Sequence, residues 1–232
     1  MAGESPDRRT RGSMDEPAIK GSIFASVIGD LRELRDGGRI SQEKLAERLS
    51  PFEQELVKSA ISPAAWYPME NYARITDLLC ELEGGNPREY FRRRGAANAR
   101  RLIEKGLYGQ LEFLKRWDKS IDGRERGDGG AVAQSYLRSL KLVVTLSKSI
   151  YSTGDWRVER DPDRANCVRI EILDAAAYSE GMRYAIEGFL NECVRAVRGS
   201  TKPLFRSDRV ARDHIRIWMV ESIGDFYGVP AD

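Results

Sequence analysis

The spacing of apolar residues changes about two thirds of the way along the chain. In the first part they recur at every third or fourth position, which is typical of amphipathic helices. The clearest stripe runs from Ile23 to Leu34 and ends at Gly37 and Gly38. Further helices are expected to begin at Ser41, Pro51 and Pro68 and to cover residues 87–105, 107–117 and 132–150. The charged, glycine-rich stretch 118–130 is a predicted loop.

From residue 155 onward the period is two, which indicates strands with one buried and one wet face. Trp156 and Val158 alternate with charged residues, and so do Ile215 and Ile217. The expected elements are strands at 155–161 and 166–173, a long helix at 179–198, and strands at 201–206 and 213–220. The predicted fold class is therefore α+β: a helical N-terminal half followed by a four-stranded antiparallel sheet (β-β-α-β-β) with a long crossover helix.

Composition and charge limit the possible domain organisation, partners and location of the protein. The chain has 232 residues, 41% of them hydrophobic, which is enough for one large domain. We expect a disordered tail over 1–18, in which Met14 is an alternative start, and a single domain over 19–232, helical over 19–150 and sheet-bearing over 151–232. The 38 basic and 36 acidic residues nearly balance, so no overall field favours nucleic acid. With no run of 18 apolar residues for a membrane span and no signal peptide, a cytoplasmic location is expected.

Two short motifs carry a resemblance to known proteins. The segment Lys20-Gly-Ser-Ile-Phe, followed by Ala65-Trp66-Tyr67-Pro68 with Tyr72 after it, resembles an uncharacterised paralogous family of myxobacterial proteins. The order of helices, hairpin, crossover helix and second hairpin is similar to the fold of TRAPP vesicle-tethering subunits, 4-vinyl-reductase ligand domains and haem-NO-binding domains. This resemblance implies dimerisation through amphipathic helices and a pocket for a hydrophobic small molecule.

Residues for catalysis or a cofactor are scarce. The one histidine, His214, heads a predicted strand, and the chain has no nucleophile elbow, phosphate loop or dinucleotide fingerprint, so no enzymatic activity is expected. Haem in the related fold is held by a histidine on a helix and by a Tyr-x-Ser-x-Arg motif; this chain has neither, and no cofactor is expected. Cys80, Cys167 and Cys193 lie in apolar patterns and are read as buried thiols rather than as a disulfide framework or a metal site.

Two sets of residues are candidates for binding. The first is aromatic and is expected to line an apolar pocket between the helices and the sheet, although such residues are also typical of a core: Trp66, Tyr67, Trp156, Phe189 and Trp218. The second is a basic set that suits anions, with a solvated helix face as its alternative: Arg92, Arg93, Arg94, Arg100 and Arg101. The function predicted is a non-enzymatic regulatory or sensory module that holds an apolar small molecule or a protein partner, as a homodimer. The alternative is an arginine-mediated binder of nucleic acid or of an anionic partner.

Overall fold

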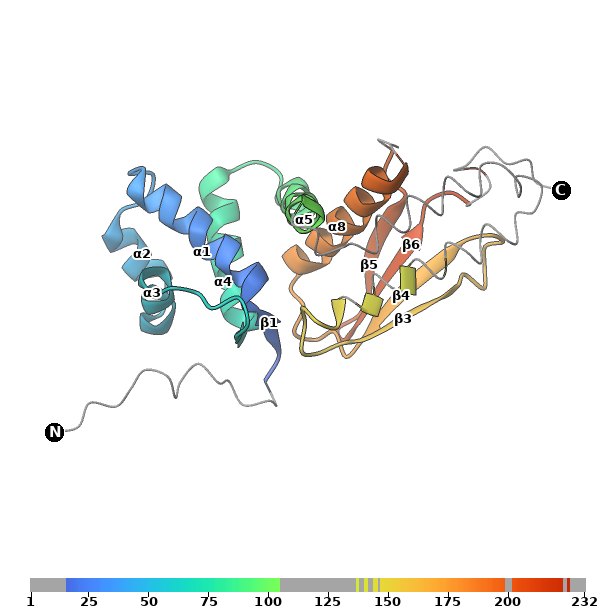
Figure 1. Cartoon of the computed structure of the whole chain (residues 1–232), viewed down its shortest axis with the longest axis horizontal. Helices are drawn as coiled ribbons and strands as arrows, with labels where there is room; N and C mark the ends of the chain where they lie inside the picture. The colour runs from blue at the N-terminus through green and yellow to red at the C-terminus, as the bar shows by residue number, and fades with distance from the viewer. Residues whose placement is uncertain are drawn as a thin grey trace.

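The computed structural model describes residues 16–104, 137, 140–141, 144–145, 147–198, 202–222 and 225. Its first half is helical, and its second half carries the main sheet (Figure 1). In chain order the elements are β1 (Ala18–Lys20), α1 (Gly21–Asp36), α2 (Gln42–Arg48), α3 (Pro51–Lys58), β2 (Trp66–Pro68), α4 (Met69–Glu83), α5 (Pro87–Glu104), β3 (Asp155–Arg160), β4 (Val168–Leu173), α8 (Glu180–Arg198), β5 (Phe205–Ala211) and β6 (His214–Met219). The predicted helix 107–117 and loop 118–130 lie outside the described residues, and the helix 132–150 is described only in part.

The main sheet has four antiparallel strands in the order β3-β4-β6-β5, and α8 crosses one of its faces (Figure 1). The α+β fold predicted from the sequence is confirmed. Residues on the face toward α8 are apolar and buried: Trp156, Val168, Ile170, Ile172, Ile215, Ile217 and Met219. One face of the sheet is buried against a helix and the other faces solvent, so apolar and polar residues alternate along these strands. This alternation is why these strands could be predicted from the sequence.

The predicted position of strand β5 was wrong. The sequence placed it at 201–206, whereas it runs from Phe205 to Ala211. Of its residues only Phe205 is buried in the apolar core, and the two positions that follow on the same face, Ser207 and Arg209, are polar. Both bind side chains of α8 instead of packing against it. The strand is at the edge of the sheet, so polar residues are tolerated there and no alternating pattern marks it.

A second, two-stranded sheet joins the two motifs on which the family resemblance rested. Lys20 in β1 lies opposite Trp66 in β2, and its ammonium sits 4.3 Å from the centre of the indole ring. Phe24 stacks on Tyr67 with ring centres 4.8 Å apart. A side chain at Gly21 would place its Cβ 2.0 Å from the carbonyl oxygen of Ser62, so this position needs glycine. The pairing of β1 with β2 was not predicted from the sequence, because Ala18 was assigned to the disordered tail and Trp66 to the residues that precede a helix.

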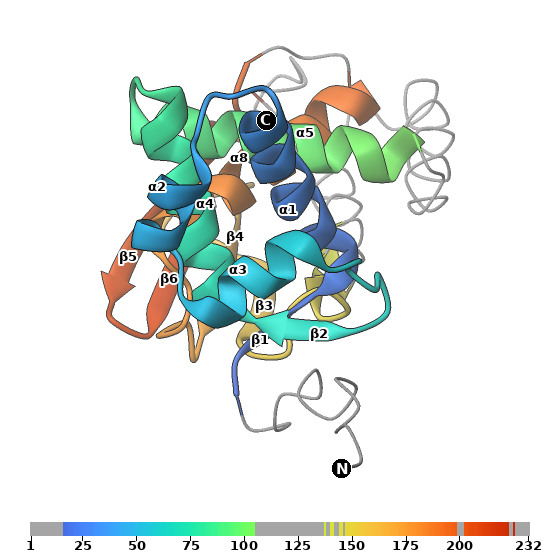
Figure 2. The same ribbon diagram turned by 90° about the vertical axis from the view of Figure 1, so that its left-hand side faces the viewer.

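Strand β1 also ties the helical half to the sheet-bearing half. On the side away from β2, Lys20 N donates to Ile150 O at 2.8 Å and Ser152 N donates to Ala18 O at 2.9 Å. Figure 2 shows β1 and β2 beside each other below α1 and α3. Buried apolar residues from both halves, among them Ile19 and Ile172, belong to one continuous core. The described residues thus form a single packed unit, and none of their helices is long and apolar enough to cross a membrane.

Helix α3 begins with a capping box that extends into the core. Glu53 accepts hydrogen bonds from Ser50 N at 2.8 Å, from Asn71 Nδ2 at 2.9 Å and from Arg74 Nε at 2.8 Å, and its side chain is buried. Burial by itself raises the pKa of Glu53, but the hydrogen bonds from Asn71, Ser50 and Arg74 outweigh it and hold the pKa below the usual value of 4.5.

Acid is therefore expected to destabilise the protein through Glu53. A folded-state pKa below 4.5 means that this stabilisation is present above pH 4.5 and is lost as the pH falls through the folded value. We expect the free energy of unfolding, measured by urea titration, to fall in that range for the natural protein and to fall less steeply for Glu53→Gln. Glu70→Gln, which removes an exposed carboxylate from the same Arg74, is the control. Equal acid dependence in all three proteins would contradict this assignment.

Candidate functional site

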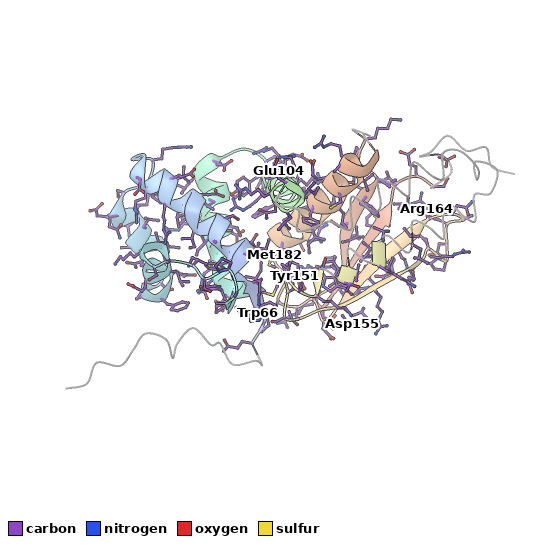
Figure 3. The ribbon with its side chains drawn as sticks, viewed as in Figure 1. Trp66, Glu104, Tyr151, Asp155, Arg164 and Met182 are labelled. Carbon is purple, nitrogen blue, oxygen red and sulfur yellow. The ribbon has the colours of Figure 1, made fainter. Side chains whose placement is uncertain are left out.

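An aromatic cluster lies where the helical half meets the sheet. Tyr151 stacks on Trp156 with ring centres 5.9 Å apart, and Tyr178 lies against both rings. Trp156 Nε1 donates to the Tyr178 hydroxyl at 3.2 Å, which donates to Thr153 O at 2.8 Å. Figure 3 shows Tyr151 and Met182 between the two halves of the molecule. Because the Trp156 Nε1 and the Tyr178 hydroxyl both have partners inside the chain, the cluster is typical of a core junction.

The five residues predicted to line one apolar pocket are not brought together. Trp66 and Tyr67 lie in β2 of the helical half, Trp156 faces the core from β3, and Phe189 packs beside Ala99 at the contact of α5 with α8. Trp218 alternates with Ile217 and Met219 along β6 and therefore lies on the opposite, solvent-facing side of the sheet. The expectation that Trp156, Phe189 and Trp218 share a lining was wrong, because a period of two sends Trp218 away from the core.

A buried polar group lies where α1, α4 and α5 meet. Arg94 is 9% exposed; its Nη2 donates to Asp30 Oδ2 at 2.7 Å and its Nη1 to the Tyr90 hydroxyl at 3.3 Å. Tyr72 lies beside the same guanidinium. Among the residues that the structure describes, none offers a hydrogen-bond acceptor to the buried Nε of Arg94. A buried donor without an acceptor is rare and costs about 1–3 kcal/mol, so this atom is a candidate contact for an oxygen from outside the chain.

The surroundings of Tyr90 and Arg94 determine their protonation states. Burial raises the pKa of Tyr90 to about 12, so its hydroxyl keeps its proton at neutral pH. Burial lowers the pKa of Arg94, but Tyr72, Tyr90 and Asp30 raise it by more, and the guanidinium stays charged. The site therefore combines a guanidinium paired with Asp30, neutral tyrosine hydroxyls and one buried N–H that has no acceptor among the described residues.

The five arginines predicted to bind anions all have carboxylate partners within the chain. Their ion pairs are Arg92 with Glu89 and Glu187, Arg93 with Glu83, Arg94 with Asp30, Arg100 with Glu192, and Arg101 with Asp30. These pairs connect α5 to α1, α4 and α8. The anion-binding hypothesis stays a prediction, but no described observation favours it, because the positive charge of this segment is compensated by neighbouring helices.

A row of polar residues on α8 closes the edge of the sheet. Arg183, Glu187 and Asn191 are four residues apart and lie on one side of the helix. Asn191 Oδ1 accepts from the backbone N–H of Leu204 and of Phe205, while Glu187 Oε2 accepts from Ser207 N at 3.1 Å. Arg183 Nη1 donates to the carbonyl oxygen of Ser207 at 2.6 Å. This row was not predicted from the sequence, although the spacing of four residues beside the apolar stripe of the helix was a detectable signal.

The outer face of the sheet carries the histidine. His214 Nε2 lies 2.5 Å from Glu171 Oε2, and the other oxygen of Glu171 accepts from Arg216 Nε at 2.9 Å. Arg169 Nε lies 3.0 Å from the same oxygen as Arg216. No serine, threonine or cysteine side chain is hydrogen-bonded to His214 in the described part of the chain. His214 is thus one member of a charged cluster and lacks the nucleophile that a catalytic reading requires.

The three cysteines are buried free thiols, as the sequence predicted. Burial raises the pKa of Cys193 to about 12, and it also raises the pKa values of Cys80 and Cys167. Thiols in this state are poor nucleophiles and poor metal ligands. In the described residues, no group of three or more histidine, cysteine or acidic side chains is placed to hold a metal ion.

Comparison with solved structures identifies the fold. The chain is similar to an Fe(II) unliganded H-NOX (haem-NO-binding) protein from K. algicida, with a TM-score of 0.54 and 13% identity over 88% of this chain and 98% of that one. A mutant of the same protein matches with a TM-score of 0.54 and 14% identity over 90% of this chain and 100% of that one. The chain therefore has an H-NOX-like fold. No family model and no curated protein matches it. The resemblances to TRAPP subunits, 4-vinyl-reductase domains and the myxobacterial family stay predictions.

The residues of this chain do not fit haem. The only histidine of the sequence lies in β6, where its Nε2 is engaged by Glu171 on the outer face of the sheet. The sequence contains no Tyr-x-Ser-x-Arg segment. The three cysteines are buried, and burial raises the pKa of each thiol. An H-NOX-like fold is thus combined with a sequence that lacks the helix-borne histidine and the Tyr-x-Ser-x-Arg motif that the resemblance implies for haem.

Proposed function

We propose that the protein is a non-enzymatic sensory or regulatory binding module with an H-NOX-like fold, and that its ligand is a small apolar molecule other than haem. The observation that carries the proposal is the buried Nε of Arg94, which has no acceptor among the described residues. A largely apolar ligand with one carbonyl or carboxylate oxygen would supply that acceptor. The apolar residues Val27, Leu31 and Ile75 of α1 and α4, all buried, are the kind of surroundings that such a ligand requires.

The H-NOX-like fold supports this proposal by analogy alone. The lack of a helix-borne histidine and of a Tyr-x-Ser-x-Arg motif in the sequence directs it toward a ligand other than haem. A charged hydrogen bond in a buried site contributes about 1.5–3 kcal/mol, so Arg94 would account for a large part of the affinity and for the orientation of the ligand. Homodimerisation and a protein partner remain parts of the same proposal.

Native and denaturing mass spectrometry, with an absorption spectrum, tests the proposal on protein purified from its source. We expect an extra mass that survives native conditions and disappears on denaturation, and no haem band. The double variant Asp30→Asn/Arg94→Met removes both charges of the pair, so that neither is left buried alone, and should lower ligand occupancy roughly ten-fold or more. Arg93→Met changes an exposed neighbour and should keep the ligand.

Three results would contradict the proposal. One is a stoichiometric haem in the purified protein. Another is a natural protein that carries no extra mass. The third is a double variant that is folded, as shown by circular dichroism and a thermal melt, and retains the ligand as fully as Arg93→Met does.

A further inference from the structure

The outer face of the sheet is hollowed into a groove that follows strand β6. The groove has a volume of about 280 Å³, and Trp218 lies in its wall. In the strand register Trp218 stands between Arg169 of β4 and Arg206 of β5. Arg164, which also lines the groove, lies at the end of the sheet remote from the helical half (Figure 3). The groove is thus separated from the Arg94 site by the whole thickness of the sheet and α8.

The arginines of this face are already neutralised or hydrogen-bonded. Arg169 lies 2.6 Å from Glu159 and 3.0 Å from Glu171, and Arg216 lies 2.9 Å from Glu171. Arg164 donates to the carbonyl oxygens of Met219 and Val220, which fixes the loop between β3 and β4 over the end of β6. Of the three arginines in the groove, only Arg164 has no carboxylate partner among the described residues.

Three carboxylates of the groove, in contrast, have no cation within ion-pair distance among the described residues. Asp163 and Asp208 are exposed, and no described cation lies within ion-pair distance of either one, although Asp208 stands opposite Arg216 in the register. Asp161 accepts only the backbone N–H of Asp163, at 3.0 Å. The groove therefore holds an excess of negative charge around a partly exposed indole ring, an arrangement that attracts organic cations because the ring face is electron-rich.

We propose that this groove is a docking site for an extended basic segment of a partner protein. Asp208 is level with Arg216, two residues along β6 from Trp218, and residues two apart on an extended chain point to the same side about 6.6 Å apart. A segment with a basic residue at every second position places one cation over Trp218 and the others beside Asp208 and Asp163. Arginine suits this better than lysine, because its planar guanidinium stacks on an indole and binds a carboxylate with two parallel hydrogen bonds.

The test is a titration with a synthetic peptide that alternates arginine and serine, followed by NMR of the tryptophan indole N–H signals. The signal of Trp218 is assigned from its disappearance in Trp218→Phe. We expect it to shift on addition of the peptide, and we expect the affinity to fall as salt is raised. Asp163→Asn/Asp208→Asn should weaken binding about ten-fold, since each exposed ion pair contributes up to about five-fold.

The matched control is Glu47→Gln/Glu55→Gln, which makes the same change of charge on α2 and α3 and should bind the peptide like the natural protein. A second peptide with glutamate in place of arginine should not bind. The proposal is overturned if the arginine peptide leaves the Trp218 signal unmoved, if the glutamate peptide binds as well, or if the aspartate double variant binds as tightly as the control. None of these readouts depends on the ligand proposed at Arg94, so the two proposals fail separately.

Discussion

Replacing Gly95 by alanine is expected to lower the free energy of unfolding by about 3 kcal/mol, at the upper end of what overpacking costs. Helices α5 and α8 touch through their backbones: a Cβ at Gly95 would lie 1.8 Å from Ala185 O, and one at Gly188 would lie 2.1 Å from Arg92 O. Neither contact is with a flexible side chain, so the two helices must separate. Gly188→Ala should behave in the same way.

The control for this prediction is Gly29→Ala in helix α1. A Cβ at Gly29 would meet no atom within 4 Å, and its φ is not in the left-handed region. Alanine there should raise the stability by about 0.5–1 kcal/mol, because glycine is a poor helix former. Urea titrations of the three variants measure the differences. If Gly95→Ala gains stability as Gly29→Ala does, the close packing of α5 on α8 is wrong.

Removing the charge of Glu187 is expected to have the second large effect, a loss of about 3 kcal/mol or more. This carboxylate is fully buried and joins three elements: Arg92 of α5 lies 2.8 Å away, Arg206 of β5 lies 3.2 Å away, and Ser207 Oγ donates to it at 2.7 Å. In Glu187→Gln both guanidinium groups lose their shared counter-charge. The free energy of unfolding at neutral pH is again the measurement.

Glu89→Gln provides a control that uses the same arginine. Glu89 is paired with Arg92 as well, at 2.6 Å, but its side chain is 55% exposed. An exposed pair of this kind contributes at most about 1 kcal/mol. A similar loss of stability in Glu187→Gln and Glu89→Gln would show that Glu187 is not the buried junction of α5, α8 and β5.

Most helices and strands were predictable because each buries one side against the core. The stripe from Ile23 to Leu34 predicted α1, and the alternation around Ile170 and Ile217 predicted β4 and β6. The elements that were not predicted correctly are a strand with few buried apolar residues and two very short strands. Strand β5 is polar because α8 supplies hydrogen bonds to it, and β1 and β2 are three residues long, too short for any period to show.

The candidate sites were less predictable than the fold. Arg94 was singled out in the sequence for its charge, but nothing in the pattern distinguished it from Arg93, its exposed neighbour. Whether an arginine on α5 faces solvent or the junction with α1 depends on how the helices are arranged. Trp218 was predicted to line an apolar pocket, whereas its alternation with Ile217 places it on the outer face of the sheet. Its neighbour Asp208 comes from a strand whose register the sequence did not reveal.

The sequence by itself determined the α+β class, the order of the strands and the helix in the C-terminal half, and the buried state of the cysteines. These properties follow from residue types and from periodicity along the chain, which are local quantities. Only the tertiary structure decided that the arginines of α5 pair with carboxylates of other elements. It also decided that, among the described residues, Arg94 Nε has no acceptor and the aspartates of the groove beside Trp218 have no cationic partner. Those properties depend on which residues meet across the fold, and distances between elements far apart in the chain are not encoded in any local pattern.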